Sequence, residues 1–575
     1  MADGKKLNLI LCWHMHQPDY RNYATGEFEL PWTYLHALKD YSDMAAHLEA
    51  QPAARAVFNF VPVLLDQLED YADQFATDTL RDPLLDLLRA KDMNRLTTAQ
   101  RDLILEFCFR CNHTRMIEPF PAFKRLRDIF MVADGHGEAG LSYLSGQYMA
   151  DLLVWYHLVW TGETVRREHE LVIQLMTKGE GFTLEERRQL LALIGQVVQG
   201  IIPRYRKLVE SGRIEISTTP HYHPIVPLLV DFKSAREAEP QASLPEAPGY
   251  PGGLGRAAFH IGSAIDSHRR RFGAPPQGFW PAEGGLSDDF LKLLGEREVR
   301  WTASGEGVLT NSLRWARDDL PLPKQTSYLY RPYRVAGAEG IACFFRDDRL
   351  SDLIGFEYAG WHGRDAVHNF VQALEHVWHD TPDNEDPVVS VILDGENAWE
   401  YYPYNGYFFL SELYDALSQH AFIRTTTFKD YLEARDTGPQ ESCAATGDLP
   451  RLVAGSWVYG TFSTWIGSPD KNRAWDLLCD AKRGFDLVMA GGRLSEAEQA
   501  AALKQLADCE SSDWFWWFGD YNPRHSVESF DKLYRENLAN LYRLLKLPAP
   551  AQLATPISHG GGQAEAGGAM RRASA

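Results

Sequence analysis

The sequence predicts an α/β fold built on parallel strands. Short apolar runs that end in polar or aromatic residues recur along the chain, and long segments with apolar residues at helical spacing lie between them. Strands that alternate with helices pair in parallel, which gives an open sheet or a barrel. We expect strands at Leu7–Trp13, Ala56–Val61, Ile214–Ser217, Gly278–Trp280, Val299–Thr302 and Val388–Leu393.

The spacing of these runs predicts the domain organisation. The strands fall within 1–435, and the helix-rich, strand-poor stretch around 65–205 predicts helical insertions in this domain. The segment "EAEPQASLPEAPGYPGG" (237–253) is rich in proline, glycine and alanine, which indicates a long surface loop or lid. Helical patterns return later, so we place a C-terminal helical domain that completes the cleft at 436–548. The glycine- and alanine-rich stretch 549–575 predicts a disordered tail.

The composition is that of a soluble globular protein, with 45% hydrophobic and 24% charged residues. A formal charge of −20 argues against a nucleic-acid partner. No apolar run approaches the roughly 18 residues of a membrane span, and no signal-peptide cleavage site follows Leu7–Trp13. The seven widely spread cysteines do not resemble a disulfide framework. We therefore expect a soluble cytoplasmic protein with no membrane partner, and the oligomeric state stays open.

Four segments share one pattern, in which a strand is followed by a polar cluster. Each is weak alone, but in parallel barrels the active site forms where the carboxyl ends of the strands meet their loops. Together the segments therefore predict a site at this edge. They are "WHMHQPD" (13–19), "GRIEISTTPHYHPIVPLL" (212–229), "GFWPAEGGLS" (278–287) and "VVSVILDGENAWEYYPYNG" (388–406).

Two acids in these segments are candidates for catalysis. Glu283 lies between a Trp-Pro pair and two glycines, and Asp394 ends an apolar strand. Two carboxylates from separate strand ends suit glycoside cleavage, in which one attacks or stabilises the anomeric carbon and the other protonates the departing oxygen. They also suit metal binding. The alternative for Glu283 is a solvated loop acid or a charge at the start of a helix.

The histidines favour a rival hypothesis. His14-x-His16 and His221-x-His223 each follow an expected strand, and alternate residues of a strand point the same way, as chelation requires. With Asp394 they resemble the ligand set of a metal-dependent amidohydrolase. Alternatively, the imidazoles form hydrogen bonds to a hydroxyl-rich ligand.

Aromatic residues crowd the same segments, and their flat rings match the C–H faces of pyranose sugars. The alternative is packing in the core, which is the usual place of tryptophan in helices. The candidates are Trp280, Trp399, Tyr401, Tyr402, Trp457 and Trp465.

Five motifs together resemble the ordered signature regions of glycoside hydrolase family 57, over residues from about 8 to about 540. They are "HMHQPD", "GRIEIS…HYHPIVPLL", "GFWPAEGG", "LDGENAW" and "GSWVYGTFSTWIGSPDKNRAW". A further stretch, "SSDWFWWFGD", is similar to a C-terminal motif of the amylopullulanase-like branch.

The resemblance implies an incomplete (β/α)7 barrel with helical insertions, followed by a C-terminal α-helical domain, with a retaining mechanism and neither a catalytic metal nor a cofactor. It implies that Glu283 is the nucleophile and Asp394 the general acid/base. The polar residues implied to line the donor subsite are His14, His16, Glu215, His221 and His223. The aromatic positions implied near the cleft are Trp280, Trp399, Trp457 and Trp465.

The family includes α-amylase, amylopullulanase, branching enzyme, 4-α-glucanotransferase and α-galactosidase. We expect an α-glucan hydrolase of the amylopullulanase/α-amylase-like branch, acting on α-1,4 and potentially α-1,6 linkages. The alternatives are an α-glucan transferase on the same site, a metal-dependent hydrolase and a non-catalytic glucan-binding protein.

Overall fold

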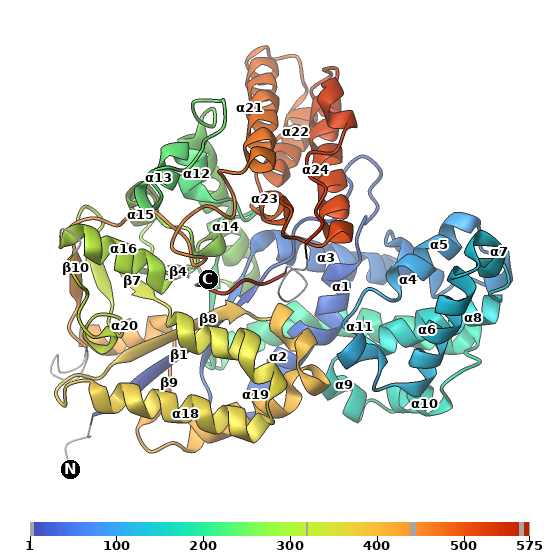
Figure 1. Ribbon diagram of the computed structural model, residues 1–575, viewed down its shortest axis with the longest axis horizontal. Helices are drawn as coiled ribbons and strands as arrows, with labels where there is room; N and C mark the ends of the chain where they lie inside the picture. The colour runs from blue at the N-terminus through green and yellow to red at the C-terminus, as the bar shows by residue number, and fades with distance from the viewer. Residues whose placement is uncertain (1–4, 318–319, 438–443, 563–568, 574–575) are drawn as a thin grey trace.

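A curled sheet forms the centre of the computed structural model, which describes residues 5–317, 320–437, 444–562 and 569–573. The strands follow the order β10-β6-β7-β5-β4-β3-β2-β1-β8, with β9 beside β1 (Figure 1). They are β1 (Leu7–Met15), β2 (Ala56–Phe60), β3 (Ile214–Thr218), β4 (Gly278–Phe279), β5 (Trp301–Ser304), β6 (Tyr333–Val335), β7 (Ala342–Phe345), β8 (Val388–Asp394), β9 (Ile423–Thr425) and β10 (Gly447–Leu449).

The strands from β7 to β8 form an incomplete barrel. Neighbours in the series β7-β5-β4-β3-β2-β1-β8 are all parallel. Its two ends meet only at an isolated parallel bridge between Arg346 and Ser390, among the described residues. The remaining strands, β6 and β10, extend the β7 edge, where β6 is antiparallel to β7. This arrangement confirms the predicted seven-strand barrel.

The first strand, β1, organises the barrel. All nine of its residues are buried, so its sequence is nearly continuously apolar, as expected for a parallel strand covered on both faces. It pairs with β8 from Asn8 to His14 along one edge. On the other edge, β9 pairs with Leu7–Leu9 and β2 pairs with Cys12–Met15.

Helices connect and cover the strands. The connection from β2 to β3 carries the predicted helical insertion, which extends to the right of the barrel in Figure 1. Its longest helix, α11, begins with a capping box formed by Thr183 and Glu186. The main helices are α2 (Ser42–Ala50), α3 (Pro62–Thr77), α5 (Thr98–Phe107), α6 (Pro121–Asp134), α8 (Gly146–Val159), α11 (Leu184–Glu210), α14 (Gly253–Phe272), α16 (Glu306–Ala316), α18 (Gly363–Asp380), α19 (Tyr407–Gln419), α20 (Phe428–Thr437), α21 (Pro469–Ala490), α22 (Glu496–Cys509), α23 (Asp513–Trp517) and α24 (Arg524–Leu544).

A buried acid joins the C-terminal helices to the barrel. The carboxylate of Glu510, which follows α22, accepts hydrogen bonds from Arg256 Nη2 and His260 Nε2 on α14, each at 2.7 Å, and from the Tyr250 hydroxyl at 2.5 Å. Burial acts to raise the pKa of Glu510, but Arg256 and His260 outweigh it and hold the pKa at about 2. The ion pair of Glu510 therefore holds the chain in place three residues before the start of α23.

The proline- and glycine-rich segment 237–253 crosses between the two parts of the molecule. Its residues from 239 to 252 form neither helix nor strand. The backbone amides of Glu246 and Ala247 donate to Asp476 on α21 at 3.1 and 2.8 Å. The predicted loop therefore lies against the helical domain.

The described parts of 549–575 lie on the body of the protein, although the composition predicts a disordered tail. The backbone amides of Ile557 and Ser558 donate to Asp531 on α24 at 2.7 and 3.2 Å. Composition could not indicate that α24 offers buried partners to this backbone. The tail and the domain boundaries stay predictions.

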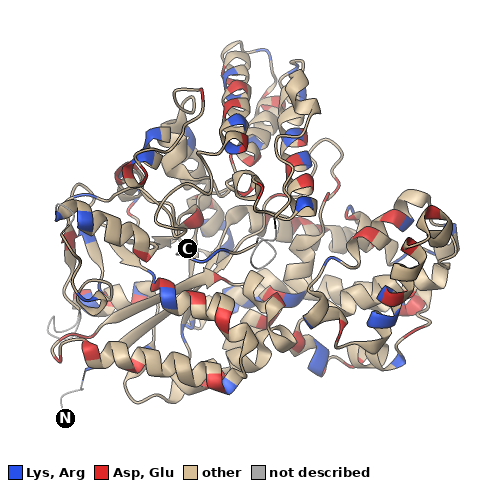
Figure 2. Cartoon of the chain, in the orientation of Figure 1, with Lys and Arg blue, Asp and Glu red and all other residues tan. Residues whose placement is uncertain are grey.

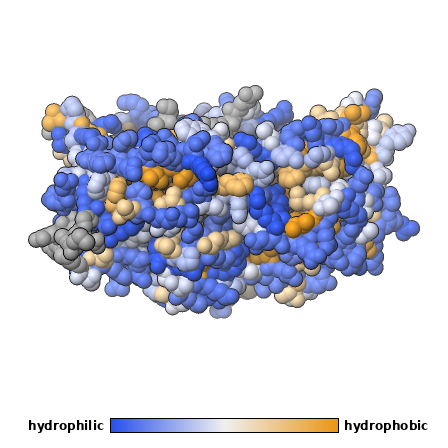
Figure 3. Space-filling view, turned by 90° about the horizontal axis from the view of Figure 1, so that it is seen from below, coloured by the Kyte–Doolittle hydropathy of each residue, from blue (hydrophilic) through white to orange (hydrophobic). Residues whose placement is uncertain are grey.

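The surface carries both signs of charge, and acidic and basic residues are interspersed along α21, α22 and α24 (Figure 2). The face seen from below is largely hydrophilic, with hydrophobic residues in separate patches (Figure 3). Among the described residues, none of the helices has the length and apolar character needed to span a membrane.

The close approach of β4 to β5 yields a test of the barrel. A Cβ at Gly278 would meet the Trp301 ring at 1.8 Å, and the indole of Trp301 is itself held by Glu215. We expect Gly278→Ala to destabilise the protein by about 3 kcal/mol or to prevent folding, because neither ring nor backbone can yield. Gly255→Ala in α14, where a Cβ meets nothing within 4 Å, should be neutral or stabilising in the same denaturant titration. Equal stability of the two variants would contradict this packing.

Candidate active site

The carboxyl-terminal edge of the barrel opens into a cavity of about 640 Å³. Side chains from β1, from the loops after β3 and β4, from β8 and from the helical domain line it. Those with polar or aromatic chemistry near its centre are His14, His16, His223, Glu283, Arg346, Asp394, Glu396, Trp457, Asp513 and Trp516. The structure therefore brings Glu283 and Asp394 to one cavity, together with three of the predicted histidines.

Glu283 is held in a strained backbone conformation just after β4. Its φ of 56° lies in the left-handed region, which costs a residue with a side chain about 1–3 kcal/mol. Trp457 fixes it twice, with Nε1 donating to Oε2 at 3.0 Å and the backbone amide donating to the Glu283 carbonyl at 3.0 Å. The side chain is buried, with 9% of the residue exposed.

Asp394 ends β8, directly beside His14 of β1 in the strand register. Its Oδ2 accepts a hydrogen bond from Asn397 Nδ2 at 3.0 Å. The turn that follows is fixed by Trp399, whose Nε1 donates to the Gly395 carbonyl at 2.8 Å. The apolar strand therefore delivers the acid to the cavity, as the sequence predicts.

The two acids are coupled electrostatically. Burial, and then the charge of Asp394, raise the pKa of Glu283 well above its ordinary value. Burial raises the pKa of Asp394 to about 6, although Asn397 and Arg346 act to lower it. An ionised Asp394 therefore disfavours ionisation of Glu283, in addition to the effect of burial.

His14 and His223 form a chain of neutral imidazoles. His14 Nδ1 lies 2.7 Å from Asn59 Oδ1, which can only accept, so His14 Nε2 is an acceptor. His223 Nε2, at 3.2 Å, donates to it, and His223 Nδ1 accepts from the Ser512 hydroxyl at 2.8 Å. Burial is the main cause that lowers the pKa of His14 to about 3 and the pKa of His223 well below its ordinary value.

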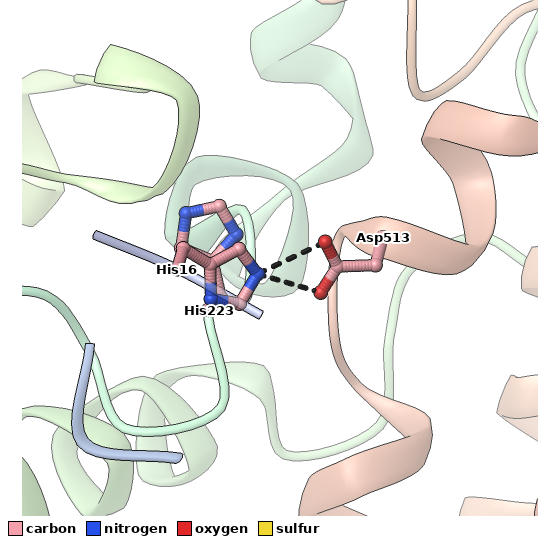
Figure 4. A group of neighbouring side chains, drawn as sticks. All are labelled: His16, His223 and Asp513. Carbon is pink, nitrogen blue, oxygen red and sulfur yellow. Dashed lines mark hydrogen bonds and ion pairs between the residues drawn. The ribbon is translucent and has the colours of Figure 1, made fainter. Parts of the chain in front are cut away.

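His16 faces the helical domain. Its Nε2 lies 2.9 Å from both carboxylate oxygens of Asp513 at the start of α23, and its ring stacks on His223 at 3.8 Å between centroids (Figure 4). Its backbone amide donates to Glu396 at 3.1 Å. The group can therefore offer fixed donors and acceptors to a hydroxyl-rich ligand.

The same three side chains are spaced for a metal ion. Single ligand atoms of His16, His223 and Asp513 lie within 4.8 Å of one another. A metal bound by His223 Nε2 would have to displace the proton that this atom donates to His14. The other ligand set that the sequence left open, with His221, is not brought together. His221 bonds Asp66 at 2.8 Å and Ser263 at 2.7 Å and does not line the cavity.

Several other predicted site residues lie behind the cavity. Glu215 sits near the start of β3, away from the carboxyl edge, where it accepts from the indole of Trp301 at 2.7 Å and the amide of Lys429 at 2.9 Å. Trp280, Trp399 and Trp465 are fully buried, and none lines the cavity. Trp280 packs edge-on against Trp457 at 5.3 Å and supports it.

Sequence reasoning missed Asp513, Arg346 and Glu396 as cavity residues. Asp513 lies in "SSDWFWWFGD", a stretch that follows none of the expected strands and whose pattern is mainly aromatic. Arg346 follows β7, a strand the sequence analysis did not find, and its guanidinium lies over the Trp457 ring at 5.2 Å. Glu396 stands beside Asp394 in the quoted strand end, so its signal was present.

The comparisons with known proteins decide the family. The sequence model described as Glycosyl hydrolase family 57 matches residues 10–444. The chain belongs to this family. This confirms the resemblance of the five motifs and makes the chain a carbohydrate-active enzyme. None of the curated protein sequences matches the chain.

Solved structures of family 57 enzymes share the fold over most of the chain. The branching enzyme of Pyrococcus horikoshii is 15% identical, with 98% of each chain covered and a TM-score of 0.55. The branching enzyme of Thermococcus kodakaraensis is 16% identical, covering 94% of this chain and 90% of that one, with a TM-score of 0.55. An α-amylase of Thermotoga maritima is 14% identical over 94% and 93%, with a TM-score of 0.53. These similarities show the fold alone.

The raised pKa of Glu283 predicts how this family 57 chain responds to pH. The folded state binds this proton more tightly than the unfolded chain, so the carboxyl weakens folding as pH rises above about 4.3. We expect Glu283→Gln to melt at a higher temperature than wild type at pH 7, and the difference to vanish near pH 4.

The matched control is Glu498→Gln on α22. Hydrogen bonds from Lys546 and Ser495 lower the pKa of Glu498 to about 2, so its loss should reduce stability at neutral pH. A Glu283→Gln protein that melts at or below the wild-type temperature at every pH would contradict the burial argument.

Proposed function

We propose that this chain is a retaining glycoside hydrolase that acts on α-glucans through a glycosyl-enzyme intermediate. The observation that carries the proposal is that Glu283 and Asp394 line one cavity, in which the charge of Asp394 acts on Glu283. A retaining mechanism needs two carboxyl groups in one site, because one must attack as a carboxylate while the other donates a proton.

Glu283 attacks the anomeric carbon while Asp394 gives its proton to the departing glycosidic oxygen. The products of this step are a glucosyl ester on Glu283, a shortened glucan with a free hydroxyl, and ionised Asp394. Water then attacks the ester: its proton goes to Asp394, its hydroxyl joins the anomeric carbon, and Glu283 leaves as a carboxylate. The pKa of Asp394, at about 6, suits this change of role near neutral pH.

The remaining cavity residues bind and orient the sugar. His14, His16, His223 and Asp513 supply hydrogen-bonding atoms at fixed positions, and the Trp457 ring supplies an apolar surface beside Glu283. The Arg346 guanidinium lies over the Trp457 ring and donates a hydrogen bond to Asp352 at 2.8 Å.

Transfer to a second glucan is the alternative. It uses the same glycosyl-enzyme, with a sugar hydroxyl in place of water. The cavity continues from the catalytic pair toward the helical insertion, where the half-buried rings of Trp32 and Phe109 line it. These rings supply a surface on which an acceptor chain could rest, which favours this candidate over simple ligand binding.

The location also remains a proposal. We place the protein in the cytoplasm, a proposal supported by six cysteines that are free among the described residues: Cys12, Cys108, Cys111, Cys343, Cys479 and Cys509.

Substitution of each acid tests the roles. We expect Glu283→Gln and Asp394→Asn to lower kcat/KM on maltoheptaose by at least about 10³-fold, because each removes a group that reacts. With α-maltosyl fluoride, Asp394→Asn should regain formation of the glycosyl-enzyme, since fluoride leaves without a proton, whereas Glu283→Gln should not.

The matched control is Glu306→Gln, a half-buried acid that accepts hydrogen bonds from Gln325 and lies outside the cavity lining. It should retain near-normal turnover. Near-normal activity of either catalytic variant on every α-glucan that wild type cleaves would end the assignment, and loss of activity on chelation would favour the metal-dependent alternative.

Product analysis separates hydrolysis from transfer. With maltoheptaose, pullulan and amylose as substrates, we expect shorter chains only, because water is the proposed acceptor. Redistribution to longer chains would identify a transferase, and new α-1,6 linkages would identify a branching enzyme.

A further inference from the structure

The last described segment, Ala569–Ala573, lies at the catalytic cavity. Figure 1 shows the C-terminal end of the chain in the middle of the molecule, between the barrel and the C-terminal helices. Ala569, Met570 and Arg571 line the cavity, and Met570 is buried, with 6% of its surface exposed. The chain thus contributes its own side chains to the space where a substrate would bind.

Contacts from two sides fix the backbone of this segment. The amide of Tyr459, close to Trp457 in the chain, donates to the Ala573 carbonyl at 2.8 Å. The amide of Ala573 donates to Asp352 at 3.0 Å, and Asp352 belongs to the connection between β7 and β8. Arg572 pairs with Glu357 of the same connection at 2.7 Å. The segment therefore connects the loop of Tyr459 to the β7–β8 connection.

Arg571 reaches from the segment over an aromatic surface. Its guanidinium lies 3.8 Å from the centroid of the Tyr521 ring and 5.1 Å from that of Trp516. These two rings form the surface that we call the aromatic platform. The charge of Arg571 also acts on Glu283, where it lowers the pKa against the larger raising effect of burial. Trp516 lines the same cavity as Glu283 and Asp394, so the platform extends to the cavity that holds the two acids.

The contact of Arg571 with the platform also has unfavourable free-energy contributions, which allow a ligand to displace it. Arg571 Nη2 is buried without a hydrogen-bond partner among the described residues, which costs about 1–3 kcal/mol. Lys471 also lies against the Tyr521 ring, at 4.9 Å from its centroid, so two cations contact one ring. Burial lowers the pKa of Lys471 to about 7, and the charge of Arg571 contributes to this shift. A neutral ligand on the platform would remove both costs.

We infer that the aromatic platform of Trp516 and Tyr521 is an α-glucan subsite, and that Ala569–Ala573 occupies it until a glucan displaces it. The inference rests on the proposed function. A pyranose ring offers apolar C–H faces to the two rings and carries no charge to oppose Lys471. Segment and glucan therefore compete for the platform, so the segment lowers the apparent affinity for glucan.

Binding measurements on the inactive Glu283→Gln protein test this competition. Its affinity for maltoheptaose is compared by titration calorimetry with that of the same protein lacking residues 569–575. If the segment covers the platform nine-tenths of the time, deletion should lower the Kd about tenfold. Arg571→Ala should give most of this gain, whereas Arg543→Ala, an exposed arginine on α24, should give none. Equal Kd values with and without the segment would overturn the inference.

Hydrogen exchange supplies a second measurement. In the full-length Glu283→Gln chain, the Ala573 amide should exchange slowly because Asp352 holds it, and saturating maltoheptaose should remove the protection. Absence of protection, or protection that maltoheptaose leaves unchanged, would also overturn the inference. If wild type cleaves maltoheptaose but deletion changes nothing, only this inference fails. If neither form binds or cleaves any α-glucan, the proposed function fails as well.

Discussion

The parallel pairing of β1 with β8 is the constraint on which the rest of the structure depends. Its register sets His14 beside Asp394, and both point toward the same side because neighbouring residues of paired strands share a face. A shift by one residue would turn the whole polar set toward the helices. The positions of Asp394 and of His14 in the cavity therefore follow from hydrogen bonds between two apolar strands.

The second requirement is that the helical domain be held firmly on the barrel. The barrel alone provides Glu283 and Asp394, but Trp457 and Asp513 come from beyond the last barrel strand. The buried ion pair of Glu510 with Arg256 fixes the end of α22, and the Ser512 amide donates to the His223 carbonyl at 3.0 Å. The site is therefore completed by docking, and weakening a contact far from the cavity would loosen Asp513.

The sequence predicted the parts of the fold that patterning determines. The sequence shows long apolar strands such as β1 and β8, because strands buried on both faces are continuously apolar. It also shows the long helices, because helices buried on one face have apolar residues at helical spacing. It could not find β7, whose "ACFF" is short and follows a turn-rich stretch, so it also missed Arg346. The two acids were predicted because each ends an apolar run at the edge where barrel sites form.

The predicted site residues that do not line the cavity share a physical reason. Glu215 and His221 stand in polar clusters, but a polar cluster near a strand does not say which side chain faces inward. Glu215 is the second residue of β3 and does not reach the carboxyl edge of the sheet. The imidazole of His221 forms a hydrogen bond with Asp66 instead of pointing into the cavity. Likewise Trp399 is a buried support whose indole holds a carbonyl, which composition cannot distinguish from a sugar-binding ring.

The two edges of β1 are filled at very different times during synthesis. Its β2 partner emerges from the ribosome soon after it, whereas β8 and β9 follow only when most of the barrel has been made. Pairing across such a separation is slow, and an open apolar edge invites contacts between nascent chains. The yield of folded protein in a foreign host therefore depends on how well the unpaired edge of β1 is shielded from other chains until β8 has been made.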